Sequence, residues 1–148
     1  MGDIRVLLVD EDEDFISELS ERLDLRDLKS DTVFDSGQAI KFVSDKEPDI
    51  MILDLKMPGI NGMEVLRGVK KACPNIQMII QTGHGNDLDE AEARQLGVFD
   101  YLKKPSDIEL LVERIKVAAK AMRVKDIMAA AAFAEAGEHD TARKMMNK

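Results

Sequence analysis

Short apolar runs alternate with amphipathic stretches along the first 120 residues of the chain. Three of these runs are continuously apolar, a pattern typical of parallel strands that helices cover on both faces. Together with two weaker segments they predict five strands, at Ile4–Val9, Thr32–Phe34, Asp49–Leu53, Gln77–Gln81 and Phe99–Leu102.

The segments between the predicted strands carry apolar residues at helical spacing. The predicted inward faces are formed by Phe15, Ile16, Leu19 and Leu23 within residues 13–28, by Ala39, Ile40 and Val43, and by Val65, Leu66 and Val69. Two pairs have the spacing of capping boxes at helix starts, Asn61 with Glu64 and Ser106 with Glu109. Strands that alternate with helices predict an α/β fold with a doubly wound parallel sheet. We assign residues 1–122 to this domain.

Residues 123–148 are predicted to form a helical extension of different composition. The stretch Ala121–Lys148 holds eight alanines and four of the nine methionines, which favour helix. Gly137 offers a stop followed by a restart, so we expect a helical hairpin. The small residues on its predicted face suit close packing against a second helix or a second chain, which makes a homodimer possible. The alternative is that these residues only extend the last helix and fray.

Composition excludes several classes of protein. The chain has 148 residues with 29 acidic and 21 basic side chains, a net charge of -8 that disfavours direct binding to nucleic acid. Its longest apolar stretch, Ile127–Ala134, is too short to cross a bilayer, so no membrane insertion is expected. The single cysteine, Cys73, cannot form an internal disulfide, which suits a cytoplasmic location.

Polar residues follow the predicted strands at the points where the strands end. An acidic run, Asp10–Asp14, follows the first strand, Asp54 follows the third, Thr82 ends the fourth, and Lys104 follows the fifth. Because the carboxyl ends of parallel strands meet at one edge of a sheet, we expect these side chains to lie together. Clustered carboxylates repel one another unless a cation neutralises them, and oxygen ligands suit Mg²⁺. A hydroxyl and an ammonium beside them suit a phosphoryl group.

Three segments carry a specific family resemblance. Residues 48–59 (PDIMILDLKMPG), 81–85 (QTGHG) and 99–105 (FDYLKKP) resemble the receiver domain of two-component response regulators. The resemblance covers roughly residues 3–120, in order and at the family's spacing. It implies a flavodoxin-like fold with a five-stranded parallel sheet.

The resemblance also implies roles for single residues. By position, Asp54 would accept the phosphoryl group, Thr82 would hydrogen-bond it, and Lys104 would pair with its charge. Tyr101 would be the aromatic switch residue that responds together with Thr82. The domain would assist its own phosphorylation and dephosphorylation without being an enzyme that turns over a separate substrate.

The resemblance further implies a Mg²⁺ site. Asp10 and Glu11 would be the acidic pair that positions the ion, with Asp54 and the backbone carbonyl of Lys56 as further ligands. The family most often has Asp-Asp or Glu-Asp at the acidic pair, whereas Glu11 stands second here and is followed by Asp12. The longer glutamate could shift the ion or let Asp12 contribute.

The implied partners are a sensor histidine kinase or phosphotransfer protein and a downstream protein target. Two alternatives come from the same residues. The segment Asp10–Asp12 also resembles the Asp-x-Asp of Mg²⁺-dependent phosphatases, and a pseudo-receiver would serve only as a scaffold without being phosphorylated. The remaining residues that could bind metal, Cys73, His84 and His139, have no partners at ligand spacing. We interpret Cys73 as packing and both histidines as surface residues.

Overall fold

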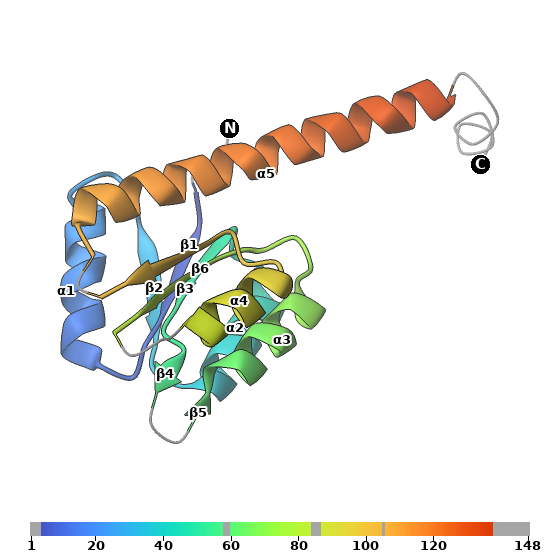
Figure 1. The fold of residues 1–148 in the computed structure, drawn as a ribbon. Coiled ribbons are helices and arrows are strands. Elements are labelled where there is room, and N and C mark those ends of the chain that lie inside the picture. The colour runs from blue at the N-terminus through green and yellow to red at the C-terminus, as the bar shows by residue number, and fades with distance from the viewer. Residues whose placement is uncertain (1–3, 58–59, 84–86, 105, 138–148) are drawn as a thin grey trace.

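The computed structural model describes residues 4–57, 60–83, 87–104 and 106–137. In these residues five strands form one sheet, two short strands form a separate pair, and five helices surround the sheet (Figure 1). The sheet contains β1 (Val6–Val9), β2 (Ser30–Val33), β3 (Ile50–Leu53), β6 (Gln77–Thr82) and β7 (Asp100–Lys103), and the short pair is β4 (Lys56–Met57) with β5 (Ile60–Asn61). The helices are α1 (Glu13–Asp24), α2 (Ser36–Lys46), α3 (Gly62–Ala72), α4 (Asp87–Gln95) and α5 (Ile108–Gly137).

The sheet is doubly wound. Its strand order is β2-β1-β3-β6-β7, and every neighbouring pair is parallel. The chain adds β2 on one side of β1 and the remaining strands on the other, so the order reverses between β1 and β3. This confirms the predicted flavodoxin-like fold. In such a sheet, ligands bind outside the carboxyl ends of the strands at the reversal, which is where Asp10 and Asp54 stand.

The two faces of the sheet form two hydrophobic cores. Along β1, Leu7 and Val9 belong to the core beneath α2, α3 and α4, whereas Val6 and Leu8 belong to the core beneath α1 and α5. Figure 1 shows the same layering, with α1 and α5 on one side of the sheet and the other helices opposite. Burial on both faces explains why the central strands are continuously apolar. Cys73 packs against the first of these cores, as the sequence predicted.

The predicted strands agree with the observed ones to within two residues at each end. The largest difference is β2, which starts at Ser30 and includes Asp31, although the sequence predicted Thr32 as its first residue. β2 is an edge strand that pairs only with β1, and Asp31 is exposed. A polar start is tolerated there, so apolar patterning could not detect it.

The aspartate directly before the first residue caps each of the three helices α1, α2 and α5. Asp12 accepts a hydrogen bond from the Phe15 amide, and Asp35 caps α2 in the same way. At α5 the predicted capping box of Ser106 and Glu109 is wrong, because Asp107 Oδ1 accepts the Glu109 amide at 3.1 Å. The predicted box of Asn61 and Glu64 concerns a side chain outside the described residues.

The segment between β3 and α3 contains a feature that the sequence did not predict. β4 and β5 pair antiparallel, with Lys56 opposite Asn61. Gly62, the first residue of α3, lies against the backbone of Leu55, the residue after Asp54. A Cβ added at Gly62 would come within 2.5 Å of the Leu55 Cα, so only glycine fits here without moving that backbone.

Helix α5 continues well past the sheet. It runs from Ile108 to Gly137, so the first part of the predicted extension is continuous with the last helix of the domain (Figure 1). The second arm of the expected hairpin, residues 138–148, lies outside the described residues, as do His84 and His139. None of the helices in the described parts of the chain is both long and apolar enough to span a membrane.

Replacing Gly62 with alanine should move the backbone that follows Asp54. We expect the Gly62→Ala variant to lose about 1–3 kcal/mol of unfolding free energy, because the new methyl group overpacks against Leu55. Chemical denaturation measures this loss. Gly37→Ala, in the first turn of α2, is the matched control, because its nearest neighbour is an Asp35 oxygen at 3.5 Å. Equal stability of the two variants would contradict the packing argument.

Candidate functional site

The backbone brings the predicted site residues to one edge of the sheet. The amide of Asp10 donates to the Val33 carbonyl at 3.3 Å, and the amide of Asp54 donates to the Val9 carbonyl at 3.1 Å. On the other side of the site, the amide of Lys104 donates to the Thr82 carbonyl at 2.9 Å. These bonds continue the parallel ladders past the strand ends, and they hold Asp10, Asp54, Thr82 and Lys104 on four successive strands.

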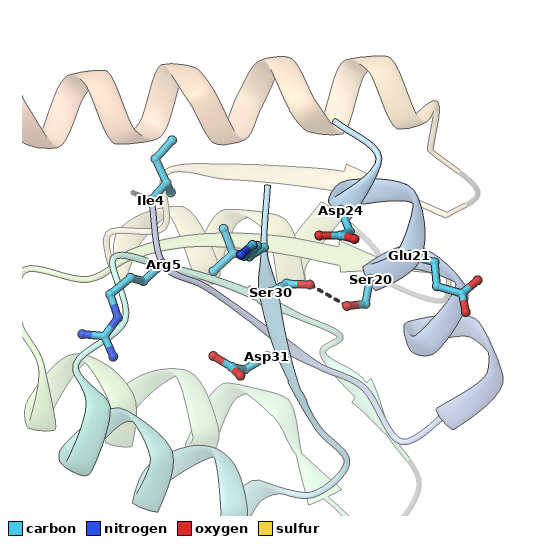
Figure 2. A pocket seen from close by; sticks show the side chains of 9 residues that line it. Ile4, Arg5, Ser20, Glu21, Asp24, Ser30 and Asp31 are labelled. Atoms are coloured by element: carbon cyan, nitrogen blue, oxygen red, sulfur yellow. Dashed lines mark hydrogen bonds between the residues drawn. The ribbon is translucent and has the colours of Figure 1, made fainter. Parts of the chain in front are cut away.

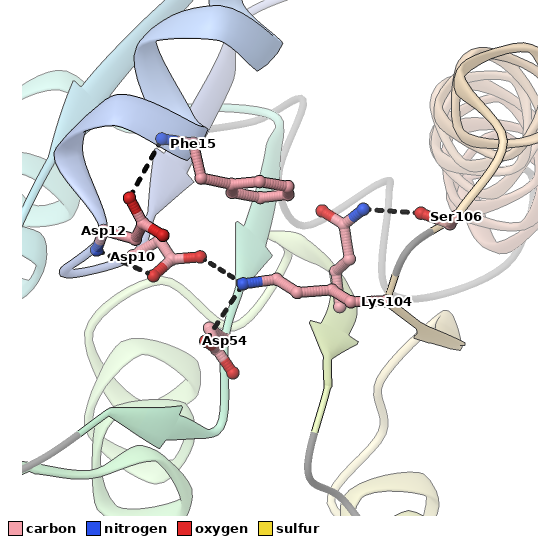
Figure 3. Close-up of polar contacts among 7 residues, drawn as sticks. Asp10, Asp12, Phe15, Asp54, Lys104 and Ser106 are labelled. Atoms are coloured by element: carbon pink, nitrogen blue, oxygen red, sulfur yellow. Dashed lines mark hydrogen bonds and ion pairs between the residues drawn. The ribbon is translucent and has the colours of Figure 1, made fainter.

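One ammonium group connects two carboxylates at this edge. Lys104 Nζ lies 2.5 Å from Asp10 Oδ2 and 3.1 Å from Asp54 Oδ2 (Figure 3). The three side chains are mostly buried, with exposed fractions of 19% for Lys104, 6% for Asp10 and 11% for Asp54. The Phe15 ring covers the ammonium, with its centroid 4.2 Å from Nζ. Residues 94 positions apart in the sequence therefore share one charge cluster.

The carboxylates keep this ammonium charged. Burial on its own lowers the pKa of Lys104, but the hydrogen bond with Asp10 and the negative charges of Asp10 and Asp54 outweigh it, so the net pKa lies above its ordinary value. In turn, the positive charge permits two carboxylates to stand close together away from water. A change that removed Lys104 would leave their repulsion uncompensated.

The acidic run after β1 divides into different roles. Asp10 points into the site, and its Oδ1 accepts the amide of Asp12 at 3.0 Å. The Asp12 carboxylate caps α1 through Oδ1. Its contribution to a metal site, which the sequence left open, stays a prediction. Glu11, Glu13 and Asp14 are exposed. The last two lie in the first turn of α1, where negative charge complements the helix dipole.

The donor set at this edge suits a hard cation. Among the described residues, no group of three or more His, Cys, Asp or Glu side chains is arranged to hold a metal ion. Two carboxylates, Asp10 and Asp54, nevertheless converge on one positive charge, and Mg²⁺ commonly uses one or two carboxylates together with water. Lys56 begins β4 close after Asp54 in sequence, and only its backbone is described.

Thr82 and Tyr101 are buried on neighbouring strands. Thr82 is 1% exposed at the end of β6, and Tyr101 is 7% exposed in β7 with its ring among the core residues beneath α4. Within the described residues the Tyr101 hydroxyl has no hydrogen-bond partner. Its pKa is raised by burial and by the negative charges of Asp89, Glu90 and Asp54. The tyrosine is therefore neutral and turned inward.

Several contacts near the site were not predicted from the sequence. Phe15 was assigned only to a helix face, although its ring also covers Lys104. Asp100 accepts hydrogen bonds from Arg114 at 2.5 Å and from the Tyr101 amide at 2.8 Å, and it pairs with Arg94 at 3.6 Å. This network ties α4 and α5 to β7 beside Tyr101. No local sequence pattern predicts this network, because its members come from three separate elements.

One hollow in the described surface lies away from this site. It has a volume of about 610 Å³ and lies at the opposite edge of the sheet, near the starts of β1 and β2 (Figure 2). Its lining mixes Arg5 and Lys29 with Glu21, Asp24 and Asp31, so it has no single charge preference. Figure 2 shows the Ser20–Ser30 hydrogen bond on its wall, at 2.8 Å. The lining of this hollow contains none of the predicted site residues, which lie in the charge cluster instead.

Known proteins share this arrangement of elements. Residues 6–116 match the family model of the response regulator receiver domain. The C4-dicarboxylate transport transcriptional regulatory protein DctD of Pseudomonas aeruginosa is 32% identical over 120 residues, which are 81% of this chain and 26% of that protein. The DNA-binding transcriptional regulator NtrC of Escherichia coli is 42% identical over 88 residues, which are 56% of this chain and 19% of that protein.

A solved structure agrees with this match. The signal receiver domain of a putative LuxO repressor protein from Vibrio parahaemolyticus superposes with a TM-score of 0.80 at 26% identity, covering 86% of this chain and 98% of that one. The chain spans about a quarter or less of the length of the two curated relatives above. The family match, however, covers most of this chain. The chain belongs to the response regulator receiver domain family of two-component signalling systems.

Proposed function

We propose that this receiver domain accepts a phosphoryl group on Asp54 and then changes its protein contacts. The observation that carries the proposal is the Lys104 ammonium, which bridges Asp10 and Asp54 at the carboxyl edge of the sheet. A carboxylate that already has a cation and a second carboxylate beside it is prepared for a negatively charged reaction partner. Asp54 also lies at the reversal of strand order, where ligands bind in this class of fold.

In the proposed reaction, a carboxylate oxygen of Asp54 attacks phosphorus while the bond between phosphorus and the donor's leaving group breaks. Negative charge accumulates on the phosphoryl oxygens during this displacement. The Lys104 ammonium, 3.1 Å from Asp54, offsets that charge and afterwards pairs with the bound phosphoryl group. The Thr82 hydroxyl, at the end of the neighbouring strand, donates a hydrogen bond to a phosphoryl oxygen.

Asp10, Glu11, Asp54 and the backbone carbonyl of Lys56 would hold the Mg²⁺ ion that the family generally uses. When bound, Mg²⁺ neutralises charge on phosphoryl oxygens and helps to orient them. Asp10 is suited to the role, since the Asp12 amide fixes one of its oxygens and the other contacts the Lys104 ammonium that also contacts Asp54. Glu11 is exposed beside it.

The switch would operate through Thr82 and Tyr101. A phosphoryl group on Asp54 offers new acceptor oxygens, and the Thr82 side chain moves toward them. This movement of Thr82 leaves space beside it. The Tyr101 ring, which is already buried, moves into that space, so the face formed by α4, β7 and α5 changes its shape. A shift of a few kcal/mol is enough to change which state is populated.

The proposed phosphoryl donor is a sensor histidine kinase or a phosphotransfer protein, acting in the cytoplasm. The proposed output is a contact with a downstream protein, without direct binding of this chain to nucleic acid. The net charge of -8 supports that output, because it opposes association with phosphate backbones. The Asp-x-Asp phosphatase alternative is not favoured, since the Asp12 carboxylate is used as a helix cap. The scaffold alternative is not favoured either, because Asp54 is present in the charge cluster.

We also propose that α5 mediates a homodimer. Leu110, Val117 and Val124 are exposed on α5 at intervals of seven residues, and Ala131 continues the stripe. The stripe lies on the side of the helix away from the buried Ile115, so a second copy can approach it.

The acceptor is tested by labelling with acetyl phosphate and Mg²⁺. We expect one phosphoryl group per chain and none on the Asp54→Asn variant, because the amide is not a nucleophile. Intact-mass spectrometry measures both. Asp31→Asn, in β2 at the opposite edge, is the control and should label normally. Full labelling of Asp54→Asn would refute the assignment, and sustained Mg²⁺-dependent hydrolysis of p-nitrophenyl phosphate would favour the phosphatase alternative.

The switch is tested with the Thr82→Ala variant. We expect it to remain able to accept phosphate, but to lose most of the conformational response around Tyr101, because no hydroxyl then follows the phosphoryl group. NMR chemical shifts on the α4–β7–α5 face, recorded before and after beryllofluoride addition, measure the response. Thr32→Ala in β2 is the control. Shift changes in Thr82→Ala as large as those of the wild type would rule out this coupling.

The dimer is tested by sedimentation of the full chain against a version that ends at Met122. We expect the full chain to associate and the shortened one to remain monomeric, because Val124 and the following apolar residues are removed. The Val124→Glu variant should also be monomeric, whereas Lys116→Glu, off the stripe, should behave as the wild type. Equal monomer mass and equal thermal stability of the full and shortened chains would show that the extension has no role in assembly or packing.

A further inference from the structure

A buried amide stands next to Thr82 in the middle layer of the molecule. Gln81 is 4% exposed in β6, a strand whose preceding residues Met78, Ile79 and Ile80 are fully buried and apolar. A buried amide costs free energy unless it is hydrogen-bonded, so its presence in such a strand requires a partner. The identity of that partner indicates what Gln81 does.

The partner lies on the loop that carries Lys104. Gln81 Nε2 donates to Ser106 Oγ at 2.5 Å, and Ser106 stands two residues after Lys104 and directly before the cap of α5 (Figure 3). The bond joins two segments that are 25 residues apart in the sequence. Ser106 is therefore used for this contact and not for the helix cap that its spacing to Glu109 predicted.

The loop that carries Lys104 and Ser106 is therefore bonded at two points to the end of β6. The Lys104 amide is bonded to the Thr82 carbonyl at 2.9 Å, and the next described residue, Ser106, is bonded to the neighbouring Gln81. Alternate residues of β6 face opposite cores, with Ile79 beneath α1 and α5 and Ile80 on the other side. By this alternation Gln81 faces α1 and α5, and Thr82 faces away from them.

The same side of the sheet holds the ring that covers the ammonium. Gln81 and Ser106 line a hollow of about 210 Å³ together with Phe15. The Phe15 ring lies over Lys104 Nζ, so the Gln81–Ser106 bond and the ammonium are arranged around one aromatic side chain. A lysine side chain is flexible, and its charge reaches a defined place only if its backbone is held.

We propose that Gln81, through Ser106, is a positioning residue for Lys104 in phosphoryl transfer to Asp54. This inference rests on the proposed function. Gln81 itself touches neither Asp54 nor the phosphoryl group. It fixes the loop from which Lys104 reaches both carboxylates, and among the described residues the backbone bond of Lys104 to Thr82 is the other bond from this loop to β6.

The test compares the rate of labelling by acetyl phosphate in Gln81→Leu, Ser106→Ala and the double variant. We expect each single variant to be about 3- to 10-fold slower than the wild type, because small displacements of a charged group reduce transfer strongly. The double variant should be no slower than the slower single one, since both changes remove the same bond. Ser106→Thr keeps a hydroxyl and should restore most of the rate.

Two further measurements separate positioning from a general loss of structure. The Mg²⁺ affinity, measured by calorimetric titration, should stay at the wild-type value, because the proposed ligands do not include this loop's side chains. Ser20→Ala removes the Ser20–Ser30 bond between α1 and β2 at the far edge, and as the matched control it should label at the wild-type rate. If Gln81→Leu does not fold, Ser106→Ala on the half-buried loop carries the test.

Wild-type rates in both single variants would overturn the inference. A double variant slowed by the product of the two single factors would also overturn it. A loss of Mg²⁺ affinity by the same factor as the loss of labelling rate would do the same. A wild-type protein that is not labelled at Asp54 would instead overturn the proposed function, and the inference with it. Slow single variants with an intact Mg²⁺ affinity and a non-additive double variant support it.

Discussion

The ammonium of Lys104 allows Asp10 and Asp54 to lie close together with little access to water. Asp10 follows β1 and Asp54 follows β3. The parallel pairing of these two strands brings the two carboxylates together although both are negatively charged. Two such charges repel strongly in a poorly solvated site. Lys104 Nζ contacts both, which stabilises the arrangement and keeps the lysine charged. The strand ends of the sheet and the chemistry of the site therefore depend on one cation.

That dependence explains how the site can respond to a ligand. In the proposed reaction, a phosphoryl group on Asp54 would bring new negative charge to a place where Lys104 is already present, so the ammonium would have a stronger partner than the carboxylates alone. Residues on both sides of the sheet are connected to this change in the partner of Lys104. Thr82 and Tyr101 lie toward the core beneath α4, whereas Gln81 and Ser106 lead to the start of α5. The long helix α5 is therefore attached directly to the loop that carries the ammonium.

Much of this could be predicted from the sequence, because the central strands are buried on both faces and read as apolar runs. Asp10, Asp54 and Thr82 stand at the ends of such runs, Lys104 follows the edge strand β7, and parallel pairing places all four at the carboxyl edge. The edge strand β2 was placed less well, since its first residues are polar and exposed. Apolar periodicity does not detect the start of such a strand.

The features that the sequence could not predict are those in which side chains meet across separate elements. The choice of Asp107 over Ser106 as the cap of α5 depends on Gln81, which takes the Ser106 hydroxyl from another strand. The β4–β5 pair is accompanied by the close approach of Gly62 to the backbone of Leu55. Likewise, Phe15 has the same spacing whether it packs in a core or covers an ammonium. Local spacing does not distinguish these cases.

A crystal structure of the protein with Mg²⁺ and beryllofluoride tests the central role of Lys104 most directly. We expect a beryllofluoride group on Asp54, with the Lys104 ammonium in contact with a fluorine atom and no longer bridging Asp10 and Asp54. An adduct on Asp54 with Lys104 still holding both carboxylates, or an adduct on another residue, would contradict it.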